Sequence, residues 1–301
     1  MEWLKDWTVR RIRSEDRFSE VFQHAGTASI RRGALKSGLH VIATMDRKID
    51  VYLQNRKTDT LIVAFCAALP ASAETLPVFQ GLGLAQRAGV SCLAVSDPSI
   101  YGTDLDLGWC LGRRGKHTVE DALVNVIRAF QMKLGIKRTL FFGASGGGYS
   151  AILIGRHFDD SSMLCVNPRL DFLKKPRIDL PHVYGQLSGD EGWEAAPTQT
   201  ILEAMPNAFD LVSNGFPGEL FIFQNTGDEV FYNNQFLPFV ETARARPSSD
   251  IFCRAERTGK GHGEAPKWIL DEIVSALLFS DRPFTGPPPA DFIPLATASA
   301  D

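Results

Sequence analysis

The stretch TLFFGASGGGYSAILIG, residues 139–155, decides the fold of this chain. An apolar segment of strand length leads into a cluster of glycines, and an apolar segment of helical length follows. Ser145 lies within GASGG, residues 143–147, which matches the pattern G-x-S-x-G. A sharp turn from strand to helix holds its serine in strained backbone geometry and leaves little room for neighbouring side chains. We therefore predict that Ser145 is a nucleophile presented on such a turn.

The same glycine cluster also resembles the dinucleotide-binding turn of short-chain dehydrogenases. In that family the turn normally follows the first strand, whereas four expected strands precede this one. The family also needs Tyr-x-x-x-Lys, and no tyrosine of this chain has a lysine four residues later. We therefore favour the nucleophile over an NAD(P)-binding site, and a purely structural glycine turn is the remaining alternative.

A serine nucleophile on this turn predicts an acid and then a histidine later in the chain, each after a strand. The segment FIFQNTGDEVF provides a strand followed by Asp228, and DIFCRAERTGKGHGEAPKW provides the final strand followed by His262. Glu229 and Asp210 are alternative acids, but Asp228 directly follows the turn Asn-Thr-Gly, from which a carboxylate can reach a histidine. We expect Ser145, His262 and Asp228 to form a catalytic triad.

The tetrahedral oxyanion of such a reaction needs two preorganised hydrogen-bond donors. The backbone amide of Gly146 is one candidate, because it directly follows the nucleophile and begins a helix. The loop AFCAALPAS after the third strand should supply the other, with the amides of Cys66, Ala67 and Ala68 as candidates. The Cys66 thiol itself is expected to be packed rather than reactive.

Outward from this turn, apolar strands alternate with helices, which predicts an α/β fold with a mostly parallel sheet and helices on both faces. Residues 39–46 and 49–55 form an expected hairpin at the start. We expect an N-terminal extension over 1–36 and the main domain over 37–280. Residues 169–218 form an expected small cap insertion, and residues 281–301 a Pro-rich flexible tail.

Composition narrows the possible partners. The chain has 301 residues, of which 44% are hydrophobic and 22% charged, so an ordinary globular fold is expected. With 32 basic and 35 acidic side chains the net charge is −3, which makes nucleic acid an unfavourable partner. The five scattered cysteines show no C-x-x-C spacing, and no signal peptide or membrane-spanning segment stands out. We expect a cytoplasmic protein without a metal or organic cofactor.

The order Ser145, Asp228, His262, each after a strand, resembles the α/β-hydrolase superfamily over residues 37–280. This resemblance implies a sheet of the eight-strand type with the active site at its carboxyl edge. The segments GASGGGYSA, VNPRLD, QNTGDEVFYNNQFLPF and GHGEAPK are more specifically similar to the surface-glycan O-acetyltransferases of accessory Sec systems. That narrower resemblance implies a glycan ester substrate and glycan-assembly proteins as partners.

A long loop, SDPSIYGTDLDLGWCLGRRGKH, should lie at the rim of the site. Tyr101 and Trp109 could stack on a sugar, and Arg113 and Arg114 could bind an anionic substituent. The alternative is a solvated loop with a buried tryptophan. A metal site at Asp104-x-Asp106 is less favoured, because no third ligand is nearby in the sequence.

Together these features predict a serine esterase or acyltransferase that acts through an acyl-enzyme on an ester, in particular an O-acyl group of a carbohydrate. A non-catalytic interaction protein of a glycan-assembly complex that keeps a hydrolase fold is the non-enzymatic alternative.

Overall fold

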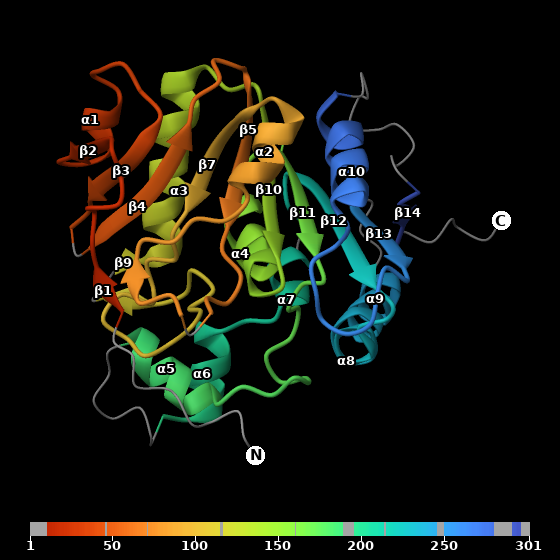
Figure 1. The fold of residues 1–301 in the computed structure, drawn as a ribbon. Coiled ribbons are helices and arrows are strands. Elements are labelled where there is room, and N and C mark those ends of the chain that lie inside the picture. The colour runs from red at the N-terminus through yellow and green to blue at the C-terminus, as the bar shows by residue number, and fades with distance from the viewer. Residues whose placement is uncertain are drawn as a thin grey trace.

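The computed structural model describes residues 11–45, 47–70, 72–114, 117–159, 161–188, 196–213, 215–245, 250–279 and 291–295. Within these residues a ten-stranded sheet forms the centre of the molecule, with the order β14-β13-β12-β11-β10-β5-β7-β4-β3-β2 (Figure 1). Its strands are β2 Val21–His24, β3 Gly38–Ala43, β4 Lys48–Gln54, β5 Thr60–Phe65, β7 Ser91–Val95, β10 Arg138–Ala144, β11 Ser161–Val166, β12 Gly218–Asn225, β13 Ile251–Glu256 and β14 Ile293–Pro294.

Most strand pairs are parallel, as expected. β4 is antiparallel to both of its neighbours, β3 and β7, and β14 is antiparallel to β13. The hairpin expected from the sequence is therefore present as β3 and β4. β5 and β7 are buried along nearly their whole length, because helices cover both faces of the sheet and leave room only for apolar side chains.

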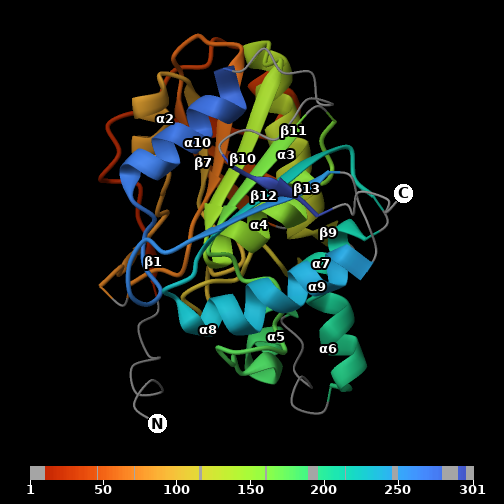
Figure 2. The ribbon, with the colours of Figure 1, turned by 90° about the vertical axis from the view of Figure 1, so that its right-hand side faces the viewer.

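Two separate hydrophobic clusters fill the spaces on the two sides of the sheet. One lies under α2 Leu82–Ala88 and α10 Lys267–Phe279, and the other under α3 Val119–Leu134 and α4 Gly146–Gly155. Figures 1 and 2 show these two helix pairs on opposite faces. Local sequence signals set both ends of α3. At the start of the helix the Thr118 side chain accepts a hydrogen bond from the Asp121 amide, and at the end of the helix Gly135 adopts a left-handed conformation.

Further short elements complete the fold. They are α1 Thr27–Ile30, α5 Leu180–Ser188, α6 Thr198–Ala204, α7 Ala208–Val212, α8 Glu229–Phe231, a π-helical turn Tyr232–Phe236, α9 Leu237–Ala245, and the strand pairs β1 Ile12–Arg13 with β6 Thr75–Leu76 and β8 Arg113–Arg114 with β9 His117–Thr118. Helices α5 and α6 lie within the expected cap segment 169–218, beyond the carboxyl ends of the parallel strands (Figure 1).

The boundaries expected at residues 36 and 280 do not coincide with the edges of the sheet. β2, from the expected N-terminal extension, pairs in parallel with β3, and β14, from the expected tail, pairs with β13. Each of these short strands forms hydrogen bonds with a strand that would otherwise be the edge of the sheet. Because the paired strands are held together by contacts outside the local sequence, the pairing is hard to predict from the sequence. The rest of the expected tail, residues 281–290 and 296–301, lies outside the described residues.

Candidate active site

Ser145 stands on a sharp turn between β10 and α4. Its backbone has φ 51° and ψ −121°, a conformation that costs free energy for any residue with a side chain. Neighbouring backbone groups hold it there: the Ser145 amide donates to the Val166 carbonyl at 2.9 Å, and the Ser145 carbonyl accepts from the amides of Gly148 at 3.1 Å and Arg169 at 3.0 Å. The strained serine is thus fixed by the ends of two adjacent strands.

The glycines around Ser145 are required by close packing of the backbone. A Cβ atom on Gly143 would lie 2.0 Å from the Gly147 carbonyl oxygen, and one on Gly147 would lie 2.8 Å from the carbonyl oxygens of Phe65 and Cys66. Neither contact is possible for a larger residue without a shift of the backbone. The glycine cluster therefore lets α4 start directly against the end of β5.

The structure brings the three residues of the expected triad together. His262 Nε2 lies 2.8 Å from Ser145 Oγ, and His262 Nδ1 lies 2.5 Å from Asp228 Oδ2. With the proton on Nδ1, the imidazole donates to the carboxylate and accepts from the serine hydroxyl. The Asp228 side chain is 3% exposed and that of His262 is 37% exposed, so the carboxylate is buried and the imidazole that it contacts is accessible to solvent.

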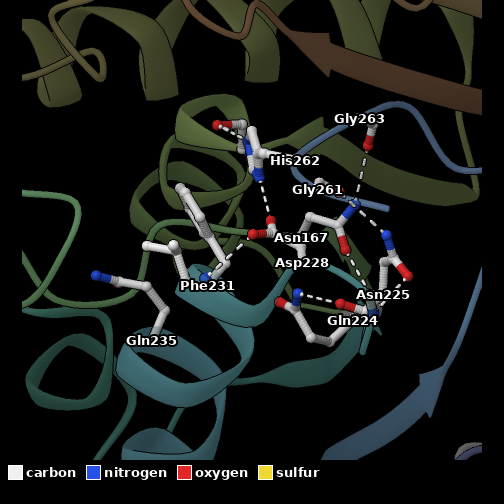
Figure 3. Close-up of polar contacts among 12 residues, drawn as sticks. Asn167, Gln224, Asn225, Asp228, Phe231, Gln235, Gly261, His262 and Gly263 are labelled. Carbon is white, nitrogen blue, oxygen red and sulfur yellow. Dashed lines mark hydrogen bonds and ion pairs between the residues drawn. The ribbon is translucent and has the colours of Figure 1, made fainter. Parts of the chain in front are cut away.

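Local structure fixes the acid and the ring. Asp228 caps α8, because its Oδ1 accepts from the Phe231 amide at 3.2 Å (Figure 3). The Phe231 ring stacks on the imidazole of His262, with the ring centroids 4.0 Å apart. One oxygen of the Asp228 carboxylate therefore caps the start of α8, and the other oxygen contacts His262.

Two asparagines that the sequence analysis did not select hold the histidine loop (Figure 3). Asn225 donates through Nδ2 to the carbonyls of Gly259 and Gly261, both at 3.2 Å, and its Oδ1 accepts from the Thr258 amide at 3.0 Å. Asn167 donates to the Gly263 carbonyl at 3.1 Å. Each asparagine follows or ends a strand, which is the sequence signal that could have identified them.

The same two asparagines are bonded to each other. The Asn225 amide donates to Asn167 Oδ1 at 2.6 Å, and Asn167 has φ 46°, which asparagine tolerates better than most residues. This bond links the ends of β11 and β12, so the histidine loop is tied to the sheet rather than to the cap.

The candidate oxyanion donors differ in their surroundings. The Gly146 amide begins α4 directly after Ser145. The Ala67 amide donates to Gln80 Oε1 at 2.9 Å and is therefore occupied by an internal acceptor. The Cys66 thiol is buried, its Sγ lies 3.2 Å from the Val78 carbonyl oxygen, and burial raises the pKa of Cys66 to about 12. A thiol of this kind is packed and not a nucleophile.

The rim-loop residues do not form the expected sugar platform. The Tyr101 hydroxyl donates to the buried carboxylate of Asp50 at 2.5 Å, although Tyr101 also lines a cavity of about 410 Å³. Trp109 is only 6% exposed and packs edge-on against Phe172, with the ring centroids 5.1 Å apart. Burial of the indole ring leaves no open face for a sugar to stack on.

Arg113 and Arg114 pair as a short strand with residues 117–118, and their side chains lie outside the described part of the structure. The acids considered as metal ligands have other partners: Asp106 forms an ion pair with Arg11 at 2.6 Å, and Asp104 lies 3.1 Å from His182 Nε2. Among the described residues no cluster of three or more His, Cys, Asp or Glu side chains is arranged to hold a metal ion.

A buried guanidinium that the sequence analysis did not select lies next to the candidate triad. Arg169 is 6% exposed, its Nη1 donates to the Pro176 carbonyl at 2.9 Å, and its Cζ lies 5.6 Å from the centroid of the Phe231 ring. Burial lowers the pKa of Arg169 to about 10, so the side chain stays charged at neutral pH. The charged group lies beside the Phe231 ring that stacks on His262, with the Asp171 carboxylate nearby.

Comparison with known proteins identifies the fold. No protein-family model and no curated protein matches the sequence. Among solved structures, the capsule O-acetyltransferase of Neisseria meningitidis serogroup A matches with a TM-score of 0.56 and 12% identity over 78% of this chain and 92% of that chain. The Glycosylation Associate Protein complex of Streptococcus agalactiae matches with a TM-score of 0.53 and 14% identity, over 75% of this chain and 42% of that chain.

A mutant puromycin hydrolase also matches, with a TM-score of 0.53 and 15% identity over 80% of this chain and 38% of that chain. These similarities show that the chain has the α/β-hydrolase fold. This fold is the one expected from the sequence. No helix among the described residues is both long and apolar enough to cross a membrane. At identities this low, the reaction and the substrate have to be argued from the site.

Proposed function

We propose that the protein is a serine-dependent acyltransferase or esterase that removes an acyl group from an ester and passes it to a hydroxyl. The observation that carries this proposal is the continuous arrangement Ser145–His262–Asp228, with the serine in strained geometry on its turn. A protein that serves only as a scaffold has no need to hold a serine in a costly conformation next to a correctly oriented imidazole.

The first half of the reaction forms an acyl-enzyme. His262 Nε2 takes the hydroxyl proton as Ser145 Oγ bonds to the ester carbonyl carbon, and the carbonyl electron pair moves onto its oxygen. Asp228 stabilises the imidazolium that results. When the carbonyl re-forms, the bond to the leaving oxygen breaks, or the bond to sulfur where the donor is a thioester such as acetyl-CoA, and His262 returns the proton to the leaving alcohol or thiol.

The second half transfers the acyl group. His262 takes a proton from an acceptor hydroxyl, which attacks the acyl carbon, and the proton returns to Ser145 as its Oγ leaves. Water gives a free acid, and a carbohydrate hydroxyl gives a new ester. Because water is present at roughly 55 M, transfer requires that the acceptor is bound and water excluded.

A carbohydrate is the acceptor class that we propose, with an acetyl group as the acyl group. Two kinds of support exist: the sequence resemblance to glycan O-acetyltransferases, and the structural similarity to the meningococcal capsule O-acetyltransferase, a mutant of which was solved in complex with CoA.

The nucleophile is tested by covalent labelling. The protein is incubated with a fluorophosphonate and its intact mass is measured, with Ser145→Ala as the test variant. Ser150→Ala is the matched control, because Ser150 is a buried serine within α4, the helix that begins directly after Ser145. One adduct in the wild type and in Ser150→Ala, and none in folded Ser145→Ala, is expected. No adduct on the folded wild-type protein would favour the scaffold alternative.

Transfer is tested by product analysis. p-Nitrophenyl acetate or acetyl-CoA is supplied with and without neutral and anionic oligosaccharides, and acetylated sugar is quantified against free acetate. Acetylated sugar that depends on the acceptor and on Ser145 is expected. Free acetate as the sole product across the acceptor panel would assign the protein as an esterase.

A further inference from the structure

The proposed reaction needs a second hydrogen-bond donor for its oxyanion. An oxyanion on the acyl carbon needs two preorganised donors, and the Gly146 amide provides one. Of the three amides expected as candidates for this donor, those of Cys66, Ala67 and Ala68, the Ala67 amide already donates to Gln80 Oε1 at 2.9 Å. A side-chain N–H group close to Gly146 is a further candidate.

The indole N–H of Trp109 is such a group. Trp109 is 6% exposed, and among the described residues its Nε1 has no hydrogen-bond partner. An indole nitrogen only donates, and a buried donor without a partner is uncommon in folded proteins. The nitrogen is shielded from solvent in this structure, so an acceptor reaches it only when neighbouring side chains move.

The position of the indole nitrogen follows from Gly146. Nε1 lies 2.8 Å from the point where a Cβ atom of residue 146 would stand. A Cβ atom is about 2.5 Å from the amide nitrogen of its own residue, so Nε1 lies within about 5.3 Å of the Gly146 amide nitrogen. One oxygen that accepts two hydrogen bonds of about 2.9 Å can bridge donors up to about 5.8 Å apart.

The backbone that carries Trp109 is strained. Trp109 and Cys110 have φ 53° and 56°, two consecutive residues other than glycine in the left-handed region. Buried Asp97 supports this turn, because its Oδ2 accepts from the Gly108 amide at 2.8 Å and its Oδ1 from the Ser99 amide at 2.9 Å. Strain of this kind persists where the surrounding structure enforces a particular orientation, and it is concentrated at functional sites.

The turn also explains why residue 146 is glycine. A Cβ atom there would lie 1.9 Å from Leu107 Cδ2 as well as 2.8 Å from Trp109 Nε1. The segment 107–109 thus occupies the space that a side chain at residue 146 would need. The missing side chain is what brings the indole N–H next to the amide that follows the nucleophile.

We propose that the Trp109 indole N–H is an oxyanion donor, which together with the Gly146 amide binds the substrate carbonyl oxygen as negative charge develops on it. The inference rests on the proposed function. No proton is transferred in this step: the N–H bond stays intact and the indole gains a hydrogen bond that it lacks in the resting protein. Because the gain is largest in the transition state, it raises kcat more than it lowers KM.

The test replaces one atom group. Site-specific incorporation of 3-benzothienylalanine at position 109 exchanges the indole N–H for sulfur and keeps the shape of the ring, and Trp109→Phe is a second variant. The rate of fluorophosphonate labelling and the kcat and KM for p-nitrophenyl acetate are measured, with thermal unfolding as a check on folding. The matched control is the same exchange at Trp268, which is 62% exposed.

We expect kcat and the labelling rate to fall about tenfold to a thousandfold at position 109, with KM and the unfolding temperature nearly unchanged, and no effect at Trp268. In ¹H–¹⁵N spectra the indole resonance that is missing from Trp109→Phe should shift downfield when the wild type is phosphonylated. Full activity and labelling of the benzothienyl variant would overturn the role of Trp109 alone. A wild type that is never labelled at Ser145 would overturn the proposed function as well.

Discussion

Two buried carboxylates near the carboxyl edge of the sheet have different partners. Asp50 is fully buried, and its carboxylate accepts from Arg13, with Nη2 at 2.7 Å, and from the Tyr101 hydroxyl at 2.5 Å. Asp228 is 2% exposed and faces the imidazole of His262, whose other nitrogen faces Ser145. Burial alone therefore does not distinguish the proposed catalytic acid from the acid of a buried ion pair.

The difference lies in the partner. Arg13 is permanently charged, so it neutralises the Asp50 carboxylate. This ion pair links β1, which contains Arg13, to β4, which contains Asp50. A neutral imidazole can accept a proton and return it, and it reaches a serine that is partly open to solvent. The two carboxylates thus differ in what they contact: Asp50 faces a permanently charged guanidinium, and Asp228 faces an imidazole that contacts a partly exposed serine.

Removal of the imidazole should have the largest effect. His262→Ala takes away the only group within hydrogen-bond distance of Ser145 Oγ that can accept its proton among the described residues, so turnover of p-nitrophenyl acetate should fall by about 10³-fold or more. The control is His182→Gln, a half-buried histidine of the cap segment. A wild-type rate in folded His262→Ala would remove the triad from the mechanism.

Replacing each of the two aspartates by asparagine, one at a time, should separate their roles. Asp228→Asn should lower kcat by somewhat less than the loss of His262, about 10²-fold or more, with a nearly unchanged unfolding temperature. Asp50→Asn should leave kcat near the wild-type value and lower the free energy of unfolding by about 1–3 kcal/mol, because Arg13 loses its ion pair.

Kinetics and chemical denaturation of both variants, together with Glu229→Gln, provide the measurement. A silent Asp228→Asn beside an inactive Glu229→Gln would show that the acid is Glu229. A loss of kcat in folded Asp50→Asn would contradict the contrast between the two carboxylates.

Loosening the histidine loop should have a smaller effect on rate. Asn225→Ala removes the bonds to the carbonyls of Gly259 and Gly261, so His262 is oriented less well and kcat should fall about tenfold to a hundredfold. The pH dependence of kcat should keep its shape, because no titrating group is removed. Asn234→Ala, which alters an exposed bond to Val230 of α8, is the control in the same kinetic assay.

The smallest effect concerns stability against pH at a site far from the triad in the sheet order. His40 is 1% exposed, and burial lowers its pKa to about 4, whereas an unfolded histidine titrates near about 6.5. The unfolded state therefore binds a proton first. The stabilisation is complete above about pH 6.5 and is lost as the pH falls towards about 4.

Denaturant unfolding of the wild type and of His40→Gln between pH 7.5 and pH 4.5 measures this contribution. The variant should lose less free energy of unfolding than the wild type over that interval. An equal pH dependence in both proteins would show that His40 does not titrate differently in the folded state.

Much of the fold and the chain positions of the site could be predicted from the sequence. The turn at residues 143–148 is specified locally, because a Cβ atom on Gly143 or Gly147 would lie only 2.0–2.8 Å from neighbouring backbone atoms and glycine has none. The alternation of strands and helices predicts a parallel sheet, and the carboxyl ends of its strands meet at one edge. Ser145, Asp228 and His262 follow three such ends, so their proximity could be expected from the order of the elements alone.

The tertiary structure decided what depends on contacts between distant segments. Gln80 occupies the Ala67 amide, Tyr101 is bonded to Asp50, and β2 and β14 extend the sheet beyond the expected boundaries. No local sequence pattern specifies such pairings. A polar side chain could pair with many groups elsewhere in the sequence, and only the folded chain determines which of them lies within reach. The surroundings of Trp109 belong to this class: the sequence places an aromatic residue in a rim loop, and the packing of that loop on Gly146 buries the indole and leaves its nitrogen without a hydrogen-bond partner among the described residues.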